Sequence, residues 1–172
     1  MKKIVLIYWT KGGNVEKSAN KIYSQFDNSD IDIFDVDSFD VDTLDYYEMI
    51  IMGNSTIGAG KWEDADSNNK WNRFFRKIEE HDLSNRKIAL FGLGNQVLYP
   101  AHFVDGLGIL NDEVKKVKGK LIGQWSTKGY TFTESEGKEG DMFFGLALDE
   151  DNEAHLTDQR VKDWTNILKK EL

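Results

Sequence analysis

The sequence predicts an α/β fold in which helices cover both faces of an open parallel β-sheet. Short apolar runs have the length and near-unbroken hydrophobicity of strands that are buried on both faces. Between them lie segments whose apolar residues recur at i, i+3, i+4 and i+7, which is the pattern of amphipathic helices. A chain of 172 residues with one proline and no repeat or linker-like tract is expected to form a single domain over residues 1–172.

Five segments are predicted to be strands. The segment 31–36 alternates apolar residues with Asp32 and Asp35, as a partly exposed strand does, and is expected at an edge of the sheet. Parallel strands are joined by right-handed crossovers, and ligands bind such sheets beyond the carboxyl ends of the strands. The loops that follow the strands are therefore the candidate binding segments. The other four strands are expected at residues 3–8, 49–53, 88–91 and 121–125.

Four apolar stripes predict helices that alternate with the strands in the order βαββαβαβα. The residues on these stripes are interpreted as core and are given no role in function. The stripes consist of Val15, Ser18, Ala19, Ile22 and Phe26; of Trp71, Phe74, Phe75 and Ile78; of Phe103, Leu107, Leu110, Val114 and Val117; and of Val161, Trp164, Leu168 and Leu172.

The chain is acidic, and the acids are unevenly distributed. The formal net charge is −8, and residues 27–66 contain twelve acids and a single base, Lys61. A surface of this sign repels nucleic acids and anionic membranes, so neither is expected as a partner, and it attracts basic proteins. The functional interpretation is that one side of the protein is strongly negative and attracts basic partners. The alternative is that the acids only keep a small protein in solution.

Other classes of site are disfavoured by residues that the sequence lacks. With no cysteine, the chain has no disulfide framework and no thiolate-bound zinc or iron–sulfur cluster, and no metal site is predicted. The first apolar run is too short for a signal-peptide core, and no stretch approaches the roughly 20 apolar residues that span a bilayer. A cytoplasmic location, without membrane association, is expected.

A glycine-rich turn follows the first predicted strand and leads straight into the first helical stripe. Such a turn lets backbone N–H groups converge on an anion, and the helix dipole adds about half a positive charge. The turn has neither a Walker A motif nor a G-x-G-x-x-G fingerprint, which disfavours ATP and dinucleotides. A phosphate cradle is the functional interpretation, and a tight turn that simply requires glycine is the alternative. The residues concerned are Thr10, Lys11, Gly12, Gly13, Asn14 and Val15.

At this turn the sequence resembles a known family. Residues 6–19 read Leu-Ile-Tyr-Trp-Thr-Lys-Gly-Gly-Asn-Val-Glu-Lys-Ser-Ala and are similar to the signature of the flavodoxins. Val15 stands where the family usually carries threonine, and Gly12 replaces a commoner hydroxyl residue. The resemblance therefore implies a phosphate site that depends on Thr10, Asn14 and backbone amides, with each missing hydroxyl bond worth about 1 kcal/mol.

Two later loops resemble the flavodoxin segments that enclose the flavin ring. Residues 53–60 resemble the loop over the inner ring face, with Ile57 where many relatives have tryptophan. Residues 91–96 match the second loop, whose backbone would bind the pyrimidine edge, and Tyr99 has the position that stacks on the outer ring face. The flavin contacts that the resemblance implies are Ser55, Thr56, Ile57, Gly58, Ala59, Leu93, Gly94, Asn95, Gln96 and Tyr99.

The C-terminal half is similar to the long-chain branch of the flavodoxins, through residues 123–130 and 145–152. In that branch a loop, here about residues 126–141, interrupts the fifth strand, which resumes near residues 142–148. The resemblance implies a flavodoxin-like three-layer sandwich with a five-stranded parallel sheet in the order 2-1-3-4-5.

The resemblance implies a low-potential one-electron carrier rather than an enzyme. It implies non-covalently bound FMN that passes between quinone, semiquinone and hydroquinone states. Flavodoxin or ferredoxin reductases and low-potential oxidoreductases are the expected partners, docking on the acidic face of a monomer. An FMN-dependent quinone reductase of the same fold is the alternative. A response-regulator receiver domain is disfavoured, because Trp9-Thr10 and Gly53-Asn54 stand where that domain needs acids.

Overall fold

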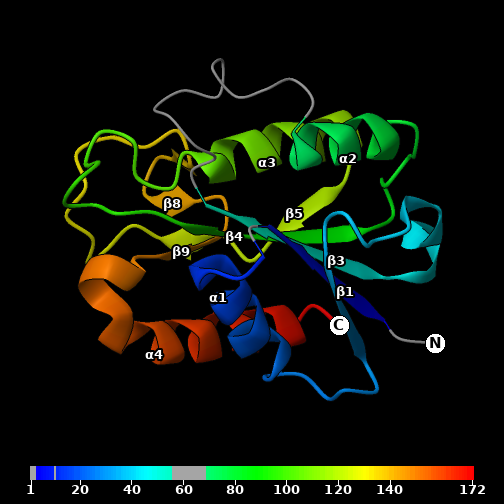
Figure 1. Ribbon diagram of the computed structural model, residues 1–172, viewed down its shortest axis with the longest axis horizontal. Helices are drawn as coiled ribbons and strands as arrows, with labels where there is room; N and C mark the ends of the chain where they lie inside the picture. Colours follow the sequence, from blue (N-terminus) through cyan, green and yellow to red (C-terminus); the bar gives the residue numbers. More distant parts are fainter. Residues whose placement is uncertain (1–2, 10, 56–68) are drawn as a thin grey trace.

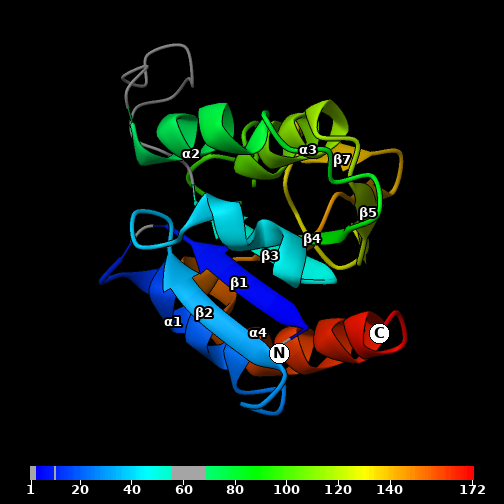
Figure 2. The ribbon, with the colours of Figure 1, turned by 90° about the vertical axis from the view of Figure 1, so that its right-hand side faces the viewer.

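The computed structural model describes residues 3–9, 11–55 and 69–172. A parallel β-sheet lies between two layers of helices, with α2 and α3 on one face and α1 and α4 on the other (Figures 1 and 2). The strands of this sheet are β1 (Ile4–Tyr8), β2 (Ile31–Asp35), β3 (Met49–Asn54), β4 (Lys87–Leu93), β5 (Lys120–Ile122) and β9 (Leu146–Leu148). The helices are α1 (Asn14–Tyr23), the 3-10 helix η1 (Val41–Tyr46), α2 (Lys70–Ile78), α3 (Gly106–Lys116) and α4 (Glu150–Lys169).

The predicted strand order is confirmed. The sheet runs β2-β1-β3-β4-β5, and β9 also pairs with β4. β5 pairs in parallel with the first half of β4, where Ile88 lies opposite Leu121, and β9 pairs in parallel with the second half, where Phe91 lies opposite Leu146. Two short strands therefore line the same side of β4, separated along the chain by residues 123–145.

Apolar side chains alternate between the two faces of the sheet and form two cores. Along β1, Val5 and Ile7 belong to the core beneath α2 and α3, whereas Ile4 and Leu6 belong to the core above α1 and α4. This period of two, repeated on β3 and β4, is what buries a central strand on both faces. The stripe prediction is confirmed for α2, whose Trp71, Phe74, Phe75 and Ile78 are all buried.

The prediction that the fifth strand extends to Trp125 is wrong. β5 ends at Ile122, and the next residue, Gly123, has a φ of +71°, a left-handed conformation that turns the chain out of the sheet. Trp125 instead lies opposite Phe143 in a small antiparallel sheet of β6 (Trp125–Ser126), β8 (Met142–Phe143) and β7 (Lys138–Glu139).

The last helix also differs from its predicted stripe at both ends. Val161, Trp164 and Leu168 are buried as expected, but Leu172 lies beyond the end of α4 and is 45% exposed. At the other end, α4 begins at Glu150, because the Asp149 side chain accepts a hydrogen bond from the Asn152 N–H and caps the helix. The early start brings the acidic first turn of α4 to the carboxyl end of the sheet.

The segment 123–145 packs on the rest of the protein through aromatic rings. Phe103, which precedes α3, contacts Tyr130, Phe132 and Phe143 of this segment at centroid distances of 5.6–5.8 Å. The Tyr130 hydroxyl donates a 2.6 Å hydrogen bond to the Ala147 carbonyl of β9, and burial raises the pKa of Tyr130 to about 12. These contacts join the segment to β9 and to the loop that precedes α3.

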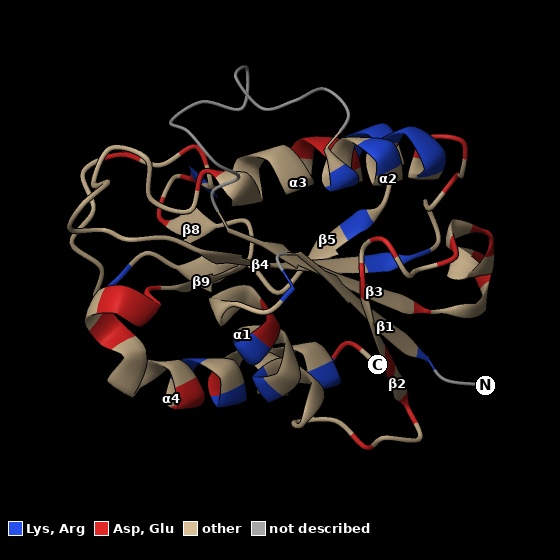
Figure 3. Ribbon diagram, in the orientation of Figure 1, with Lys and Arg blue, Asp and Glu red and all other residues tan. Residues whose placement is uncertain are grey.

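Acidic and basic residues are concentrated in different elements on one side of the fold, around β2 and η1 and in α2 respectively (Figure 3). Residues 27–48, which include β2 and η1, contain nine acids and no base. α2 presents basic side chains, and two of them, Lys70 and Arg73, form ion pairs with Asp37 across the boundary between the acidic and basic regions. Among the described residues, no helix has the length and apolar character needed to cross a membrane.

Candidate functional site

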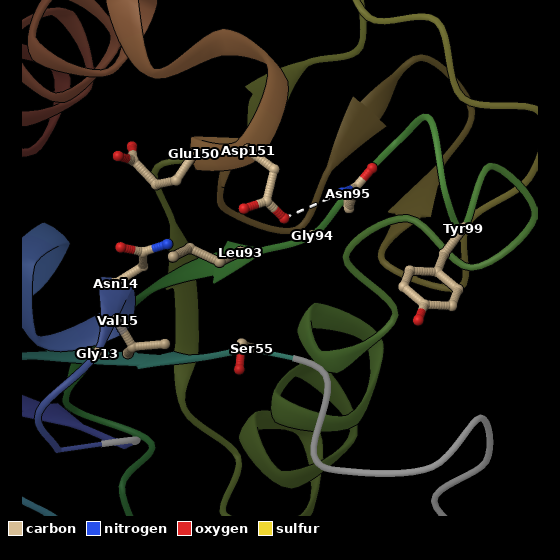
Figure 4. Close-up of a pocket in the computed structure, with 10 residues that line it drawn as sticks. All are labelled: Gly13, Asn14, Val15, Ser55, Leu93, Gly94, Asn95, Tyr99, Glu150 and Asp151. Atoms are coloured by element: carbon tan, nitrogen blue, oxygen red, sulfur yellow. Dashed lines mark hydrogen bonds between the residues drawn. The ribbon is translucent and has the colours of Figure 1, made fainter.

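A cavity of about 240 Å³ lies at the carboxyl ends of β3 and β4, beside the N-termini of α1 and α4 (Figure 4). This is the end of the sheet at which the order of strands predicts a ligand site. The residues that line it are Gly13, Asn14, Val15, Ser55, Leu93, Gly94, Asn95, Tyr99, Glu150 and Asp151.

The first wall of the cavity is the glycine-rich turn before α1. Gly12 has a φ of +81°, which favours glycine, and Gly13 occupies the N-cap position without a side chain to cap the helix. A Cβ added to either glycine would meet no atom within 4 Å, so the backbone here borders open space. Asn14 and Val15 line the cavity beside them. The predicted turn is therefore a helix N-terminus with backbone groups accessible to an anion.

Side chains at the foot of this turn form a hydrogen-bonded cluster. The Glu16 carboxylate accepts one bond from the Gly12 N–H, at 2.5 Å, and another from the Tyr8 hydroxyl, at 2.8 Å. The hydrogen bond from Tyr8, followed by that from Gly12, lowers the pKa of Glu16, while burial raises the pKa of Tyr8 to about 12. Lys11 points away to Asp35, with 3.7 Å between Nζ and Oδ2. Lys11 and Gly12 thus make contacts within the protein and do not line the cavity.

The second wall is the loop after β4, and Asn95 holds its shape. The Asn95 Oδ1 accepts hydrogen bonds from the N–H groups of Val97 and Leu98, and its amide donates a 3.0 Å bond to Asp151 (Figure 4). The next residue back, Gly94, packs so closely on the chain before α3 that an added Cβ would lie 2.9 Å from the backbone nitrogen of Val104. The loop therefore has no room for a side chain at this position. Leu93, Gly94 and Asn95, which the resemblance names as flavin contacts, line the cavity.

Gln96 is buried behind this loop rather than in the cavity. It is 3% exposed, and its N–H donates a 3.1 Å hydrogen bond to the Asp149 carboxylate. Its side-chain oxygen accepts bonds from the N–H and hydroxyl of Thr131, at 2.6 and 3.1 Å. The Gln96 N–H, one of the backbone groups that the resemblance assigns to flavin recognition, thus connects the loop with α4, and the Gln96 side chain connects it with the segment 123–145.

Tyr99 stands at the rim of the cavity with most of its ring accessible (Figure 4). The side chain is 59% exposed, and its neighbours Val97 and Leu98 are 62% and 70% exposed. Three consecutive apolar or aromatic side chains on the surface are unusual enough to indicate a contact surface. An aromatic face beside a cavity suits a planar ligand, which stacks on it.

Two acidic residues of the site were absent from the sequence prediction. Glu150 and Asp151, in the first turn of α4, line the cavity opposite Ser55 (Figure 4). The sequence signal for them is the run Asp149-Glu150-Asp151-Asn152, in which the first aspartate is an N-cap residue. Its side chain accepts a hydrogen bond from the N–H of Asn152, three residues later. Recognising a helix start there would have placed both carboxylates at the end of the sheet.

The third part of the site follows β3. Ser55, which the resemblance names as a flavin contact, lines the cavity. Thr10, Thr56, Ile57, Gly58 and Ala59 lie outside the described residues. The described walls therefore combine accessible amides at one end, an aromatic rim at the other and two carboxylates between them. Such an arrangement can hold an elongated ligand that has a planar ring and an anionic end.

The sequence matches known proteins over nearly its whole length. The family model for flavodoxin matches residues 6–164. The flavodoxin of Synechocystis sp. is 38% identical over 170 residues, with 98% of this chain and 97% of that protein covered. Flavodoxin 1 of Escherichia coli is 32% identical over 168 residues, with 97% and 93% covered.

A solved structure gives the same result. The flavodoxin of Fusobacterium nucleatum, bound to flavin mononucleotide, has a TM-score of 0.87 and 32% sequence identity to this chain. The comparison covers 100% of this chain and 99% of that one. The matches extend across every strand of the sheet and every described wall of the cavity, and they show that the chain belongs to the flavodoxin family.

Proposed function

We propose that this chain carries single electrons at low potential between redox proteins, using FMN held non-covalently in the cavity. The observation that carries the proposal is the position of that cavity, between the accessible amides of the turn before α1 and the exposed ring of Tyr99. A relative that resembles the chain at a TM-score of 0.87 is bound to FMN. FMN supplies the one-electron chemistry, and the protein supplies binding, orientation and electrostatics.

The residues present fit this cofactor. In the proposal, the backbone of Gly13 and the side chain of Asn14 bind the phosphate, and Leu93, Gly94 and Asn95 border the ring. Tyr99 stacks on one ring face, and Ser55 begins the loop that encloses the other. Thr10, Lys11, Gly12, Val15, Thr56, Ile57, Gly58, Ala59 and Gln96 belong to the proposed site through family resemblance.

Reconstitution tests the proposal. The purified chain mixed with FMN is expected to turn yellow, to bind one FMN per chain and to release FMN in acid. A stopped-flow comparison separates a carrier from the alternative, an FMN-dependent quinone reductase. We expect rapid one-electron exchange with a flavodoxin reductase and no sustained turnover of NAD(P)H with a quinone. Sustained turnover would favour the reductase, and a failure to bind FMN would refute both.

We also propose where the redox partner docks. Val97, Leu98 and Tyr99 form an exposed apolar tip, and Glu150 and Asp151 line the cavity at whose rim Tyr99 stands. This combination fits a partner with an apolar contact ringed by basic side chains, because opposite charges speed encounter and apolar contact gives affinity. The chain is proposed to act as a single-domain cytoplasmic monomer, with flavodoxin or ferredoxin reductases and low-potential oxidoreductases as partners.

Replacing Tyr99 by alanine is expected to weaken FMN binding about tenfold or more, since stacking on an aromatic ring is worth about 1–3 kcal/mol per planar base. Titration of the ligand-free protein with FMN, followed by quenching of flavin fluorescence, measures this change. Leu98→Ala is the matched control, because Leu98 is also exposed on the same loop but does not line the cavity. Equal effects of the two substitutions would show that Tyr99 does not stack on the flavin.

Neutralising Glu150 and Asp151 together is expected to raise the potential of the second one-electron reduction. The two carboxylates beside the cavity disfavour a further negative charge on the ligand. At a separation of about 7 Å in a largely aqueous medium each charge is worth about 0.5–1 kcal/mol, or about 20–40 mV. A redox titration of Glu150→Gln/Asp151→Asn checks this, with Asp112→Asn on the exposed surface of α3 as control. An unchanged or lower potential would contradict the electrostatic explanation.

A further inference from the structure

Glu16 occupies part of the turn to which the phosphate site is assigned. It is the third residue of α1, and its side chain bends back toward the residues that precede the helix. One carboxylate oxygen accepts the Gly12 N–H at 2.5 Å, and the other accepts the Tyr8 hydroxyl at 2.8 Å. The carboxylate is therefore fixed by two donors, one from the turn and one from the end of β1.

The carboxylate uses a donor that an anion in the turn would use. Gly12 directly precedes Gly13, Asn14 and Val15, which line the cavity, and its N–H is already engaged. A backbone N–H makes one good hydrogen bond at a time, so a phosphate oxygen and the Glu16 carboxylate exclude each other at this amide.

The charges around the turn also oppose the binding of a phosphate group. A second carboxylate, Asp35, lies close enough to Glu16 and Tyr8 to act on their ionisation, and the nearby base, Lys11, is paired with it at 3.7 Å. An arriving phosphate group therefore meets a fixed negative charge at the foot of its site. Like charges at short range oppose binding of the anion but leave a neutral ligand unaffected.

We propose that Glu16 competes with the flavin phosphate for the Gly12 amide, and that it sets how strongly the chain prefers FMN over riboflavin. The inference rests on the proposed function. Glu16 acts here as a specificity residue: it satisfies the amide when no phosphate is present and opposes the phosphate when it arrives. Glu16 therefore lowers the selectivity of the chain for phosphorylated flavin. This effect adds to that of the missing hydroxyl donors at Gly12 and Val15.

The test compares two flavins that differ only in the phosphate. Glu16→Gln retains an oxygen that can accept the Gly12 N–H but removes the charge, so the turn before α1 keeps this hydrogen bond. We expect it to tighten FMN binding about tenfold and to change riboflavin binding less than twofold. Tyr8→Phe removes one of the two donors that fix Glu16, so it is expected to tighten FMN binding by a smaller factor. This variant is the substitute test if Glu16→Gln does not fold. Asp27→Asn, an exposed acid just beyond α1, is the control.

A second measurement needs no flavin. Inorganic phosphate is expected to raise the melting temperature of the ligand-free protein, and Glu16→Gln should lower the concentration that gives half of this effect about tenfold. Equal weakening of FMN and riboflavin would show that Glu16 only shapes the turn, and this would overturn the proposal. Unchanged FMN binding, or no response to phosphate in either protein, would overturn it as well. A wild-type chain that binds no flavin would refute the proposed function, while the phosphate titration would still decide the role of Glu16.

Discussion

Replacing Trp164 by alanine is expected to lower the free energy of unfolding of the ligand-free protein by about 3–5 kcal/mol, the range for removing a large aromatic side chain from a core. Trp164 is completely buried in α4, in the core shared with α1. Its indole N–H also donates a 2.6 Å hydrogen bond to the Gly123 carbonyl, at the point where the chain leaves the sheet after β5. Alanine would leave a cavity and a buried carbonyl without this donor.

Urea denaturation followed by circular dichroism measures the effect. Trp164→Phe keeps much of the ring but loses the N–H, so a smaller loss of about 1–3 kcal/mol is expected. Ile167→Ala in the same helix is the matched control, since Ile167 is 39% exposed and its truncation is expected to change the free energy of unfolding by less than about 1 kcal/mol. If Trp164→Ala lowers the free energy of unfolding no more than the control does, the core must relax to fill the space that the indole leaves.

Replacing Asp149 by alanine is expected to destabilise the protein by about 2–4 kcal/mol and also to weaken FMN binding. The completely buried Asp149 carboxylate accepts hydrogen bonds from the N–H of Asn152, where it caps α4, and from the N–H of Gln96. Loss of a helix cap costs about 1 kcal/mol, and a buried N–H left without an acceptor costs about 1–3 kcal/mol more. The effect on FMN follows because Asp149 joins the loop of Tyr99 to the helix turn that carries Glu150 and Asp151.

The two effects are measured by denaturation of the ligand-free protein and by FMN titration of the variant under native conditions. Asp40→Ala supplies a cap control, because Asp40 caps η1 with the same type of bond to the Asp42 N–H but lies on the exposed surface, away from the cavity. A loss below about 1 kcal/mol and unchanged FMN affinity are expected there. Destabilisation of Asp149→Ala without any change in FMN affinity would show that the loop keeps its shape through Asn95 alone.

The sheet was predictable from sequence because burial on both faces produces a strong local signal. The runs that form β1, β3 and β4 have no polar interruption, and the alternation with Asp32 and Asp35 identified β2 as the edge. Trp125 was misplaced for the opposite reason. An apolar residue three positions after the end of a strand continues the pattern. The chain leaves the sheet because Gly123 has a positive φ, and a glycine in a sequence does not by itself show that it adopts one.

The walls of the cavity were predicted where they belong to loops after strands, and missed where they depend on a cap. Topology fixes the position of the wall residues at the carboxyl ends of strands. Leu93 is the last residue of β4, and Gly13, Asn14, Val15, Ser55, Gly94 and Asn95 come after strands. Glu150 and Asp151 reach the site only because a buried aspartate starts α4 early. The burial of Gln96 depends on Thr131, a residue 35 positions away, and no local pattern reveals such a contact.

The acids on β2 have a consequence for copies of the chain in a concentrated solution. β2 is the outermost strand on its side of the sheet, and its outer backbone groups are a template on which a strand of another molecule can add. Asp32 and Asp35 are held in place by hydrogen bonds from Tyr47 and Ser38. A second β2 brought alongside would set these fixed charges against their own copies, which disfavours edge-to-edge aggregation. The acidic residues that the sequence analysis expects to attract basic proteins therefore also disfavour self-association at this edge of the sheet.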